Sequence, residues 1–283
     1  MKLSIIIPAF NESETIGSVI HMIKELYHDA EIIVVDDAST DDTVDIAKQS
    51  GAIVLQHPYN IGNGAAIKTG IRNASGDIMV FMDADGQHQP QDIEQLLEHI
   101  PQYDMVVGAR QNQFKHSWVR TIGNRIYNAL ASYVTSFPIQ DLTSGFRAIH
   151  ANCARNYLYL LPNTYSYPTT LTLSVLKSGR SLAYVPIITK KRKSGKSQIH
   201  IIKDGIRFLM IILKICTLFS PLRIFVPISV SIFGSGLFWY GYTWFCKGRF
   251  TNMGALLFST SIIIFLMGLI SEQISQIRFE KTE

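Results

Sequence analysis

Apolar and polar positions alternate along the first 110 residues in two rhythms. Short apolar runs rich in Ile and Val predict buried strands, and the longer segments between them have helical patterns. Strand–helix alternation of this kind predicts an α/β fold with a mostly parallel sheet. The predicted strands are Leu3–Ile7, Glu31–Val35, Ile53–Gln56, Ile78–Met82 and Met105–Val107, and the predicted helices are Glu12–Tyr27, Asp41–Ser50, Gly64–Asn73 and Pro90–Ile100.

Residues at the ends of these segments suit helix boundaries. Asn11 would cap the first helix, Ser39 or Thr40 would cap the second, Gly51 follows it, and Pro90 suits a first helical turn. Polar clusters follow the strands: PAFNE after the first, DDAST after the second, DADGQH after the fourth and GAR after the fifth. Because ligands of parallel sheets bind beyond the carboxyl ends of the strands, we expect the functional site at this edge.

The last fifth of the chain is apolar in a different way. Ile224–Cys246 is 23 residues without a charge, and Met253–Ile270 is another 18. A hydrocarbon core of ~30 Å needs about 20 helical residues, so both runs are long enough to span a membrane, with two buried core helices as the alternative. The short link between them predicts a hairpin. Aromatic residues typical of a membrane interface crowd the end of the first run: Trp239, Tyr240, Tyr242 and Trp244.

Basic residues indicate the orientation of this hairpin. Both of its ends lie on one side of the membrane, and cytoplasmic sides carry an excess of Lys and Arg. Two basic residues lie in the link, against six at the ends: Lys203, Arg207, Lys214, Arg223, Arg278 and Lys281. The ends, and the domain before them, are therefore predicted to be cytoplasmic.

Residues 199–219, directly before the hairpin, have a helical pattern with a narrow polar stripe. At 100° per residue, the stripe spans an arc of about 100° on an otherwise apolar helix. It consists of His200, Lys203, Asp204, Arg207 and Lys214. This pattern is typical of an interfacial membrane helix, and a buried core helix is the alternative.

Charge is strongly segregated along the 283 residues. Residues 1–141 contain nine Lys and Arg against 18 Asp and Glu, residues 142–203 contain ten basic residues and no acid, and residues 204–283 contain seven against four. An acidic half, which would attract a metal cation, is thus joined to a basic segment, which would attract a phosphate or a membrane. We expect no nucleic-acid partner. The three cysteines are widely spaced, as is typical of a reducing compartment, and the apolar run in MKLSIIIPAFNE is too short for a signal peptide.

The fourth predicted strand runs into two carboxylates, Asp83 and Asp85, which point the same way in an extended segment. A calcium loop would match both and Glu94, but His88 stands where that loop needs glycine. DADG also resembles the nucleophile motif of haloacid dehalogenases, but there the pair closes the first strand and Thr follows, where this chain has Gln87. The third possibility is a clamp in which carboxylate oxygens hold Mg²⁺ or Mn²⁺ against a phosphorylated ligand.

Six motifs, in their order and spacing, resemble glycosyltransferase family 2: IIIPAFNE, VVDDASTDDT, NIGNGAAIKTG, FMDADGQHQP, GAR and DLTSGFRA. The resemblance covers about residues 3–200. It is greatest to the polyprenyl-phosphate glycosyltransferases, the group that contains the dolichol-phosphate mannose synthases and their bacterial undecaprenyl-phosphate relatives. It implies a GT-A fold, which is Rossmann-like with a mostly parallel sheet, a nucleotide-sugar donor, a divalent cation and C-terminal membrane helices.

The resemblance also implies roles for individual residues. Asp85 with Gln87 would hold the metal, Asp83 and Ala84 would contact the nucleotide or sugar, and Arg110 would reach the donor diphosphate or sugar. The other residues implied to line the nucleotide pocket are Pro8, Ala9, Phe10, Glu12, Val35 and Asp37. Purely structural roles remain the alternative for several of these residues. Asp36 or Asp37 would cap the following helix, Arg110 would form a surface ion pair, and Gly62, Gly64 and Gly70 would be loop and packing glycines.

The acid-free segment bears on the acceptor. Asp141 is the last carboxylate before Asp204, so the segment after it offers no base to deprotonate a hydroxyl acceptor. A phosphomonoester, with a second pKa near ~6, is already an anionic nucleophile at pH 7 and needs basic residues to hold it. The nearest candidates are Arg147, Lys191, Arg192, Lys193 and Lys196.

Two further segments leave alternatives open. KRKSGKSQ resembles the family's Arg-x-x-Gly-x-Ser-Lys motif from Arg192 onwards, but Gln198 stands in place of the final Lys. Lys196 would take over the phosphate-binding role of that Lys. Attraction of this basic run to anionic lipid is the alternative. The uncharged YSYPTT at 165–170 leaves the sugar unassigned, because its Tyr and Thr side chains would either read hydroxyls or pack.

Together with these observations, the resemblance implies a membrane-bound, metal-dependent, inverting transferase that moves a hexose-type sugar from GDP-mannose or a UDP-sugar to polyprenyl phosphate. The expected catalytic residues are Asp83, Asp85, Arg110 and Asp141, the last orienting acceptor or sugar, or serving only a turn. A family 2 enzyme for a lipid or polysaccharide hydroxyl and a non-catalytic nucleotide-sugar-binding membrane protein are the alternatives. The predicted parts are a GT-A domain (1–198), an interfacial helix (199–221), a transmembrane hairpin (222–272) and a cytoplasmic tail (273–283). The expected location is the cell membrane, and a homo-oligomer is left open.

Overall fold

The computed structural model of the protein describes residues 1–111, 118–164, 166–189, 217, 220–249 and 251–280. The chain divides into two compact units, Met1–Ile201 and Ile202–Glu283. This division lies close to the predicted end of the catalytic domain at residue 198.

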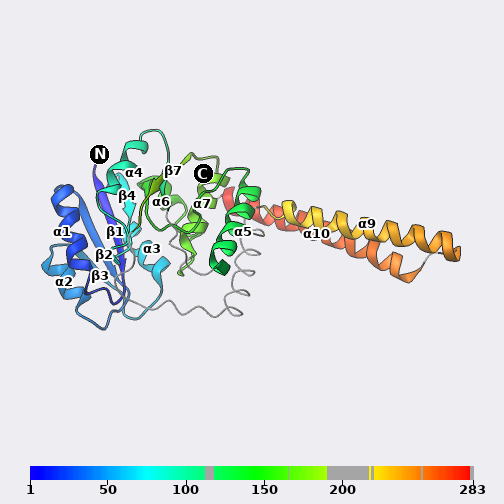
Figure 1. The fold of residues 1–283 in the computed structure, drawn as a ribbon, viewed down its shortest axis with the longest axis horizontal. Helices are drawn as coiled ribbons and strands as arrows, with labels where there is room; N and C mark the ends of the chain where they lie inside the picture. Colours follow the sequence, from blue (N-terminus) through cyan, green and yellow to red (C-terminus); the bar gives the residue numbers. More distant parts are fainter. Residues whose placement is uncertain (112–117, 165, 190–216, 218–219, 250, 281–283) are drawn as a thin grey trace. The chain divides into compact units, whose positions relative to one another are not determined.

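A seven-stranded sheet forms the centre of the first unit (Figure 1). Its strands are β1 (Leu3–Ala9), β2 (Glu31–Asp36), β3 (Ile53–Gln56), β4 (Ile78–Phe81), β5 (Met105–Arg110), β6 (Arg147–His150) and β7 (Leu182–Ile187). They lie in the order β3-β2-β1-β4-β6-β5-β7, with β6 antiparallel to β4 and β5 and the other neighbours parallel. The predicted mostly parallel α/β sheet is confirmed, with one reversed strand.

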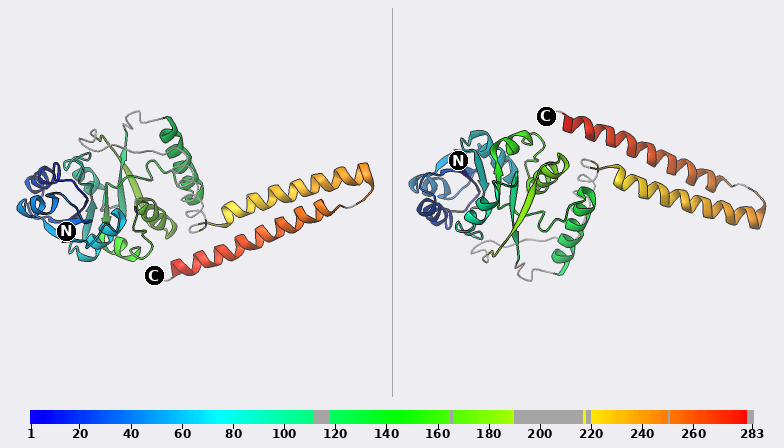
Figure 2. Two further views of the ribbon diagram at one scale, coloured as in Figure 1. Left: turned by 90° about the horizontal axis from the view of Figure 1, so that it is seen from below. Right: turned by 90° about the horizontal axis from the view of Figure 1, so that it is seen from above.

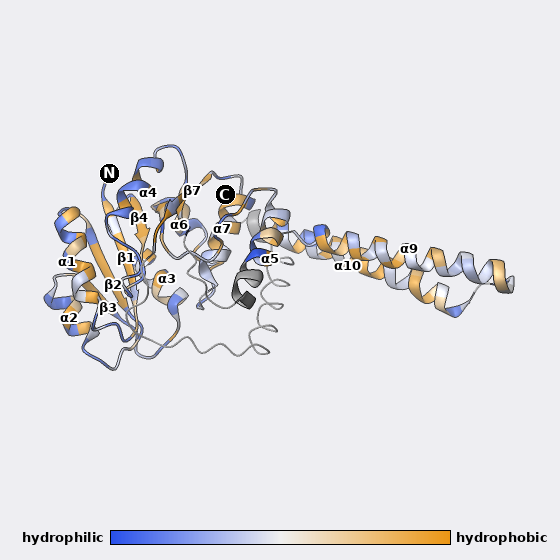
Figure 3. Cartoon of the chain, viewed as in Figure 1, coloured by the Kyte–Doolittle hydropathy of each residue, from blue (hydrophilic) through white to orange (hydrophobic). Residues whose placement is uncertain are grey.

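Helices cover both faces of this sheet because successive strand residues point to opposite sides. Ile5, Ile7 and Val34 face a core shared with α1, α2 and α4, whereas Ile6 and Val35 face a core shared with α3, α6 and α7. The strands are the most hydrophobic part of this unit (Figure 3). The helices are α1 (Ile16–Leu26), α2 (Thr43–Gln49), α3 (Asn63–Asn73), α4 (Asp92–His99), α5 (Trp118–Thr135), α6 (Ala151–Asn156) and α7 (Tyr167–Lys177).

The reversed strand β6 brings a distant segment to the functional edge of the sheet. Its first residue, Arg147, pairs with Phe81 at the end of β4 and with Val107 in β5. Since β6 runs opposite to these strands, it begins where they end. The preceding segment, residues 141–146, therefore lies beyond the carboxyl end of β4 and beside the last residues of β5.

The predicted helix caps differ from the structure. Helix α1 begins after Thr15 rather than at Asn11, and neither α1 nor α2 has a side-chain cap hydrogen bond. Asn11 instead adopts a left-handed backbone, φ 54°, and its side-chain oxygen accepts from the amide of Thr40 (2.8 Å). The hydroxyl of Ser39 accepts from the amide of Asn11 (2.8 Å). These polar residues connect two loops to each other rather than ending helices. Gly51, φ 79°, does follow the second helix, as predicted.

The second unit contains an antiparallel pair of long helices, α9 (Leu222–Lys247) and α10 (Asn252–Glu280), which lie side by side (Figure 2). Both are long and apolar enough to cross a membrane, over Leu222–Cys246 and Asn252–Ile277. Only 11% and 17% of their most apolar windows are buried within the protein, which disagrees with the alternative of two core helices. Helix α10 continues to Glu280, so most of the predicted tail at 273–283 is helical.

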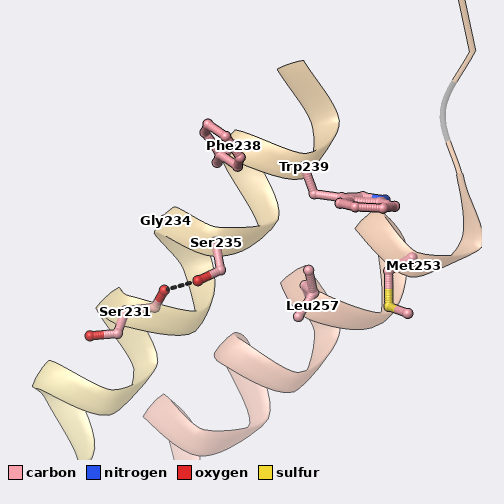
Figure 4. Close-up of a pocket in the computed structure, with 7 residues that line it drawn as sticks. All are labelled: Ser231, Gly234, Ser235, Phe238, Trp239, Met253 and Leu257. Carbon is pink, nitrogen blue, oxygen red and sulfur yellow. Dashed lines mark hydrogen bonds between the residues drawn. The ribbon is translucent and has the colours of Figure 1, made fainter. Parts of the chain in front are cut away.

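Small residues and hydroxyls hold the two helices together. The hydroxyl of Ser229 donates to the carbonyl of Ser261 (2.9 Å), and that of Ser261 donates back to the carbonyl of Ser229 (2.9 Å). A Cβ at Gly236 would lie 3.1 Å from Leu257. An open groove of about 750 Å³ runs over this hairpin (Figure 4), lined by Ser231, Gly234, Ser235, Phe238, Trp239, Met253 and Leu257. The predicted interfacial helix at 199–221 lies almost wholly outside the described residues.

Candidate active site

Polar side chains from five segments meet at the carboxyl edge of the sheet. They follow β1, β2, β4 and β5, and the fifth segment is the loop that leads into β6. The predicted position of the site, beyond the strand ends, therefore agrees with the topology. The side chains fall into a group on β1 and β2, a pair of carboxylates after β4, and a charged cluster around Arg110.

Asp37, which directly follows β2, organises the loop that follows β3. Its carboxylate accepts hydrogen bonds from the amides of Ile61 (2.9 Å) and Gly62 (2.8 Å), and His57 Nδ1 lies 2.7 Å from Oδ1. The other ring nitrogen of His57 lies 2.9 Å from the hydroxyl of Thr69. Asp37 thus shapes the loop over residues 57–62, and it does not cap helix α2, whose N-cap is Asp42.

The predicted nucleotide-pocket residues separate into buried and exposed sets. Phe10 is 45% exposed and Glu12 is half-buried, so both side chains are accessible at this edge. The side chains of the other four are buried, as is that of Ala84: Pro8, Ala9, Val35 and Asp37.

The DADGQH turn is held by one hydrogen bond from outside it and one within it. The hydroxyl of Thr15 donates to the carbonyl of Ala84 (2.7 Å), which fastens the turn to helix α1. The amide of Gln87 donates to Oδ1 of Asp85 (3.1 Å), and Gly86 between them has φ 68°, a value that favours glycine. Asp83 and Asp85 are both partly exposed at the mouth of the turn.

Arg110 is the basic residue at the centre of the site. Its Nε donates to Oδ2 of Asp141 (2.7 Å) and its Nη2 donates to Oδ1 (2.9 Å), a bidentate ion pair. Nη2 also donates to the hydroxyl of Thr143 (2.6 Å). Burial alone would raise the pKa of Asp141, but the hydrogen bonds and charge of Arg110 hold that pKa below its ordinary value. Arg110 therefore forms an ion pair, which was the structural alternative to a role in donor binding. Its side chain is nevertheless 29% exposed at the site.

His88 is a site residue whose role sequence reasoning missed. It is buried, and its ring stacks on Phe146 with centroids 4.9 Å apart and planes at 13°. Burial lowers its pKa to about 4, with Asp85 opposing and Arg110 reinforcing that shift, so the ring is neutral at pH 7. In the sequence His88 served only to reject a calcium loop. Its position could have indicated a role, because His88 directly follows Gln87, the last residue of the expected metal motif.

Arg147 does not lie where the sequence prediction placed it. We expected it to hold a lipid phosphate, but its side chain is fully buried. Its guanidinium donates to the carbonyl of Pro168 (3.0 Å), to the hydroxyl of Thr172 (3.2 Å) and to the carbonyl of Ser144. A group with no access to solvent and with these partners is a structural element of the site, not a phosphate ligand.

Comparison with known proteins agrees with this geometry. Residues 4–158, more than half of the chain, match the family described as glycosyl transferase family 2. The chain belongs to glycosyltransferase family 2. Residues 220–277 match a second family, the GtrB C-terminal hairpin, which corresponds to α9 and most of α10.

Relatives of this glycosyltransferase include two with named activities. The undecaprenyl-phosphate 4-deoxy-4-formamido-L-arabinose transferase of Proteus mirabilis is 25% identical over 98% of this chain and 89% of its own. The undecaprenyl-phosphate mannosyltransferase of Micrococcus luteus is 28% identical over 70% of this chain and 87% of its own. An uncharacterised protein of Methanocaldococcus jannaschii is 35% identical over 66% of this chain and 81% of its own.

Solved structures share the fold of the family 2 domain. The glucosyl-3-phosphoglycerate synthase of Mycobacterium tuberculosis, with Mn²⁺, UDP-glucose and phosphoglyceric acid, superposes with a TM-score of 0.61 at 22% identity, over 76% of this chain and 79% of that one. The same synthase with Mg²⁺ and UDP gives 0.61 at 24% identity, over 76% and 78%. The predicted GT-A fold is confirmed.

The glycines of the NIGNGAAIKTG motif are closely packed. A Cβ at Gly62 would lie 2.4 Å from the carbonyl oxygen of Asn163, and one at Gly64 would lie 2.2 Å from that of Pro162. A Cβ at Gly70 would lie 2.3 Å from Ile6. These glycines let helix α3 approach residues 162–164 and β1, which was the alternative reading of this motif.

The donor atoms present suit a hard divalent cation. The expected ligands, Asp85 and Gln87, offer a carboxylate and an amide oxygen from one turn, and Asp83 lies two residues before Asp85 in the chain. Within the described part of the chain, no group of three or more His, Cys, Asp or Glu is placed to hold a metal. A cation here would therefore need oxygen ligands from a bound diphosphate as well. The predicted phosphate ligands Arg192 and Lys196 lie outside the described residues.

Proposed function

We propose that this family 2 enzyme transfers a hexose-type sugar from a nucleotide-sugar donor to polyprenyl phosphate, with inversion at the anomeric carbon. The observation that carries the proposal is the state of Asp141. This carboxylate is the last one before the acid-free segment, and it is bound to Arg110 through two hydrogen bonds with its pKa lowered. A carboxylate in that state is a poor general base, so the site suits an acceptor that is already an anion.

The donor side of the proposal rests on the carboxylates after β4. Asp85 and Gln87 would hold Mg²⁺ or Mn²⁺, which when bound neutralises charge on the departing diphosphate. Asp83 and Ala84 would contact the nucleotide or sugar. The loops after β1 and β2, with Phe10, Glu12 and Asp37, lie on the β1–β2 side of this pair, where the nucleotide would bind.

The chemistry assigned to the chain's own residues is mainly positioning and charge stabilisation. A phosphate oxygen of the acceptor attacks the anomeric carbon while the bond to the nucleoside diphosphate breaks, and the electron pair leaves on the diphosphate oxygen. Arg110, fixed by Asp141, would supply positive charge to the transferring phosphates. No proton has to be removed from the acceptor, so no base is required.

The acceptor is suggested by the named relatives and by the second unit. The relatives from Proteus mirabilis and Micrococcus luteus both carry undecaprenyl phosphate in their names, and the first of them matches 98% of this chain. A polyprenyl phosphate presents its charge at a membrane surface, and two helices of this chain are able to span a membrane. We propose that these helices anchor the enzyme in the cell membrane as a hairpin, with the catalytic unit cytoplasmic and residues 199–221 at the interface.

A transfer assay tests the proposal against its alternatives. The full-length protein, purified in detergent with Mn²⁺ or Mg²⁺, would be given labelled UDP-glucose, UDP-galactose or GDP-mannose with either undecaprenyl phosphate or free undecaprenol. Transfer to the phosphate alone is the expected result. Transfer to the alcohol but not to the phosphate would overturn the mechanism and favour a hydroxyl acceptor. Absence of transfer from every donor, with nucleotide-sugar binding retained, would favour a non-catalytic binding protein.

A further inference from the structure

The carboxylate of Asp83 lies in a narrow space between two segments. A Cβ built on Gly145 would lie 3.1 Å from Oδ2 of Asp83 and 3.3 Å from the phenol oxygen of Tyr167. The carboxylate and the phenol therefore converge over the bare backbone of Gly145. Any side chain at position 145 would push into both.

Tyr167 forms the second wall of this space. It is the first residue of helix α7 and is 2% exposed, and its ring meets Phe81, the last residue of β4, edge-on at 6.5 Å. Burial first, and the charge of Asp83 second, raise the pKa of Tyr167, so the phenol keeps its proton. A protonated phenol next to a carboxylate presents a hydrogen-bond donor to it.

Arg147 holds the two walls together. Its guanidinium donates to the carbonyl of Ser144, the residue before Gly145, and to the carbonyl of Pro168, the residue after Tyr167. One planar group thus connects the segment before β6, which includes Gly145, to the start of α7, which includes Tyr167. Arginine suits this task because its donors form a rigid fork, which a lysine ammonium cannot reproduce.

The charges in this region are also complementary. Burial of a guanidinium is costly unless nearby groups compensate it. The oxygens bonded to Arg147 are neutral. Burial lowers the pKa of the Arg147 guanidinium, and the negative charges of Asp141 and Asp83 are among the influences that oppose this shift. The buried cation and the two carboxylates of the site therefore stabilise one another.

We propose that Arg147 and Tyr167 are positioning residues for Asp83, which they hold in place for the donor nucleotide sugar. Arg147 acts through the Ser144–Gly145 and Tyr167–Pro168 segments, and Tyr167 acts through its hydroxyl. This inference rests on the proposed donor contact of Asp83. It assigns a positioning function to Tyr167, for which the sequence allowed either contact with sugar hydroxyls or packing. It also replaces the predicted phosphate-binding role of Arg147 with a positioning role.

Tyr167→Phe is the most direct test because it keeps the ring against Phe81 and removes only the hydroxyl. We expect kcat/KM for the nucleotide sugar to fall on the order of 10-fold, with KM for undecaprenyl phosphate and the melting temperature unchanged. Tyr157→Phe is the matched control, since Tyr157 is a buried tyrosine of the same core whose hydroxyl bonds with Arg180. Donor kinetics of Tyr167→Phe within twofold of wild type would overturn the role of the hydroxyl.

Arg147→Lys tests the connection that the guanidinium makes between the two segments, and Gly145→Ala tests the narrow space beside Asp83. Both should lower donor kcat/KM by a similar factor, and Arg155→Lys, which alters a guanidinium bonded to the carbonyl of Ala74, should not. A loss shared equally by donor and acceptor constants and accompanied by a lower melting temperature would mean that Arg147 only supports the fold, and would overturn its positioning role.

A binding measurement separates this inference from the proposed function. The affinities of wild type and Tyr167→Phe for UDP-glucose and GDP-mannose, with Mn²⁺ present, can be compared by calorimetry without any turnover. If wild type binds a nucleotide sugar but transfers nothing, the proposed function fails, while weaker binding by Tyr167→Phe would still support the positioning of Asp83. Equal affinity would overturn it.

Discussion

The guanidinium of Arg110 and the carboxylate of Asp141 form a bidentate ion pair at the carboxyl edge of the sheet, with N–O distances of 2.7 and 2.9 Å. The two residues are far apart in the sequence, at the end of β5 and in the loop before β6. They meet because β6 is inserted in reverse between β4 and β5. The pair fixes the direction of Arg110 and at the same time occupies the last carboxylate before the acid-free segment.

Removing the negative member of this pair should affect both stability and turnover. In Asp141→Asn the guanidinium loses its charged partner in a largely buried place, which typically costs about 3 kcal/mol. We expect a lower melting temperature and a lower kcat, with the KM for the donor less affected. Thermal unfolding and steady-state transfer in the same detergent measure these effects. If Asp141 were instead the general base, Asp141→Glu would retain substantial kcat and its pH profile would follow the new carboxylate.

The stabilising effect of Asp141 should depend on pH in a defined direction. Its pKa in the folded protein lies below the value of about 3.9 of an unfolded chain, so the pair stabilises the protein fully above pH ~4. As pH falls through the lower folded-state pKa, that contribution is lost. The difference in melting temperature between wild type and Asp141→Asn should be constant from pH 8 to 5 and should narrow below pH ~4. A difference that grows on acidification would contradict the assignment.

Much of the sheet could be predicted because its strands are short and rich in Ile and Val, and most of them are buried. Strand β3 begins and ends at the predicted residues, and the predicted β1, β2, β4 and β5 differ only at their carboxyl ends. Those ends are where apolar patterning gives way to the polar clusters of the site. The position of the site followed from this arrangement.

The second half of the catalytic unit could not be predicted in the same way. Helix α7 is buried along Tyr167–Val175, so it has no polar face and no helical periodicity to detect. Strand β6 is four residues long and begins with an arginine, a residue that seldom starts a buried strand. The burial of Arg147 and the stacking of His88 on Phe146 depend on tertiary contacts between segments distant in sequence. Local patterns contain no information about such contacts.

Asp85 should be necessary for metal-dependent turnover. A bound cation commonly supplies several kcal/mol of stabilisation to a departing diphosphate, so Asp85→Ala should reduce transfer roughly 1,000-fold. Asp45→Ala is a suitable control because Asp45 is an exposed carboxylate on helix α2. The comparison requires a Mn²⁺ titration of each variant. Full turnover by Asp85→Ala would refute the metal assignment.

The serine pair of the hairpin should contribute little to stability and nothing to chemistry. Interhelical hydrogen bonds in membrane proteins average about 0.6 kcal/mol, so Ser229→Ala should destabilise the hairpin by about that amount. Ser259→Ala is the matched control, because its hydroxyl bonds within its own helix, to the carbonyl of Ala255 (2.8 Å). Unfolding in mixed micelles would measure the difference. A large loss of transfer activity in Ser229→Ala would contradict a purely structural role.

The proposed orientation predicts which side of the membrane each part occupies. The link between α9 and α10 includes Arg249, and the catalytic unit offers the exposed Asp45. In a variant without Cys153, Cys216 and Cys246, a membrane-impermeant maleimide added to intact cells should label Arg249→Cys but not Asp45→Cys. In permeabilised cells, both positions should be labelled.

The six basic residues at the hairpin ends, against two in the link, are the physical reason for this orientation, since Lys and Arg near spanning helices are retained on the cytoplasmic side. Labelling of Asp45→Cys in intact cells would place the catalytic unit outside, and labelling of neither site would mean that the helices do not cross the membrane as a hairpin.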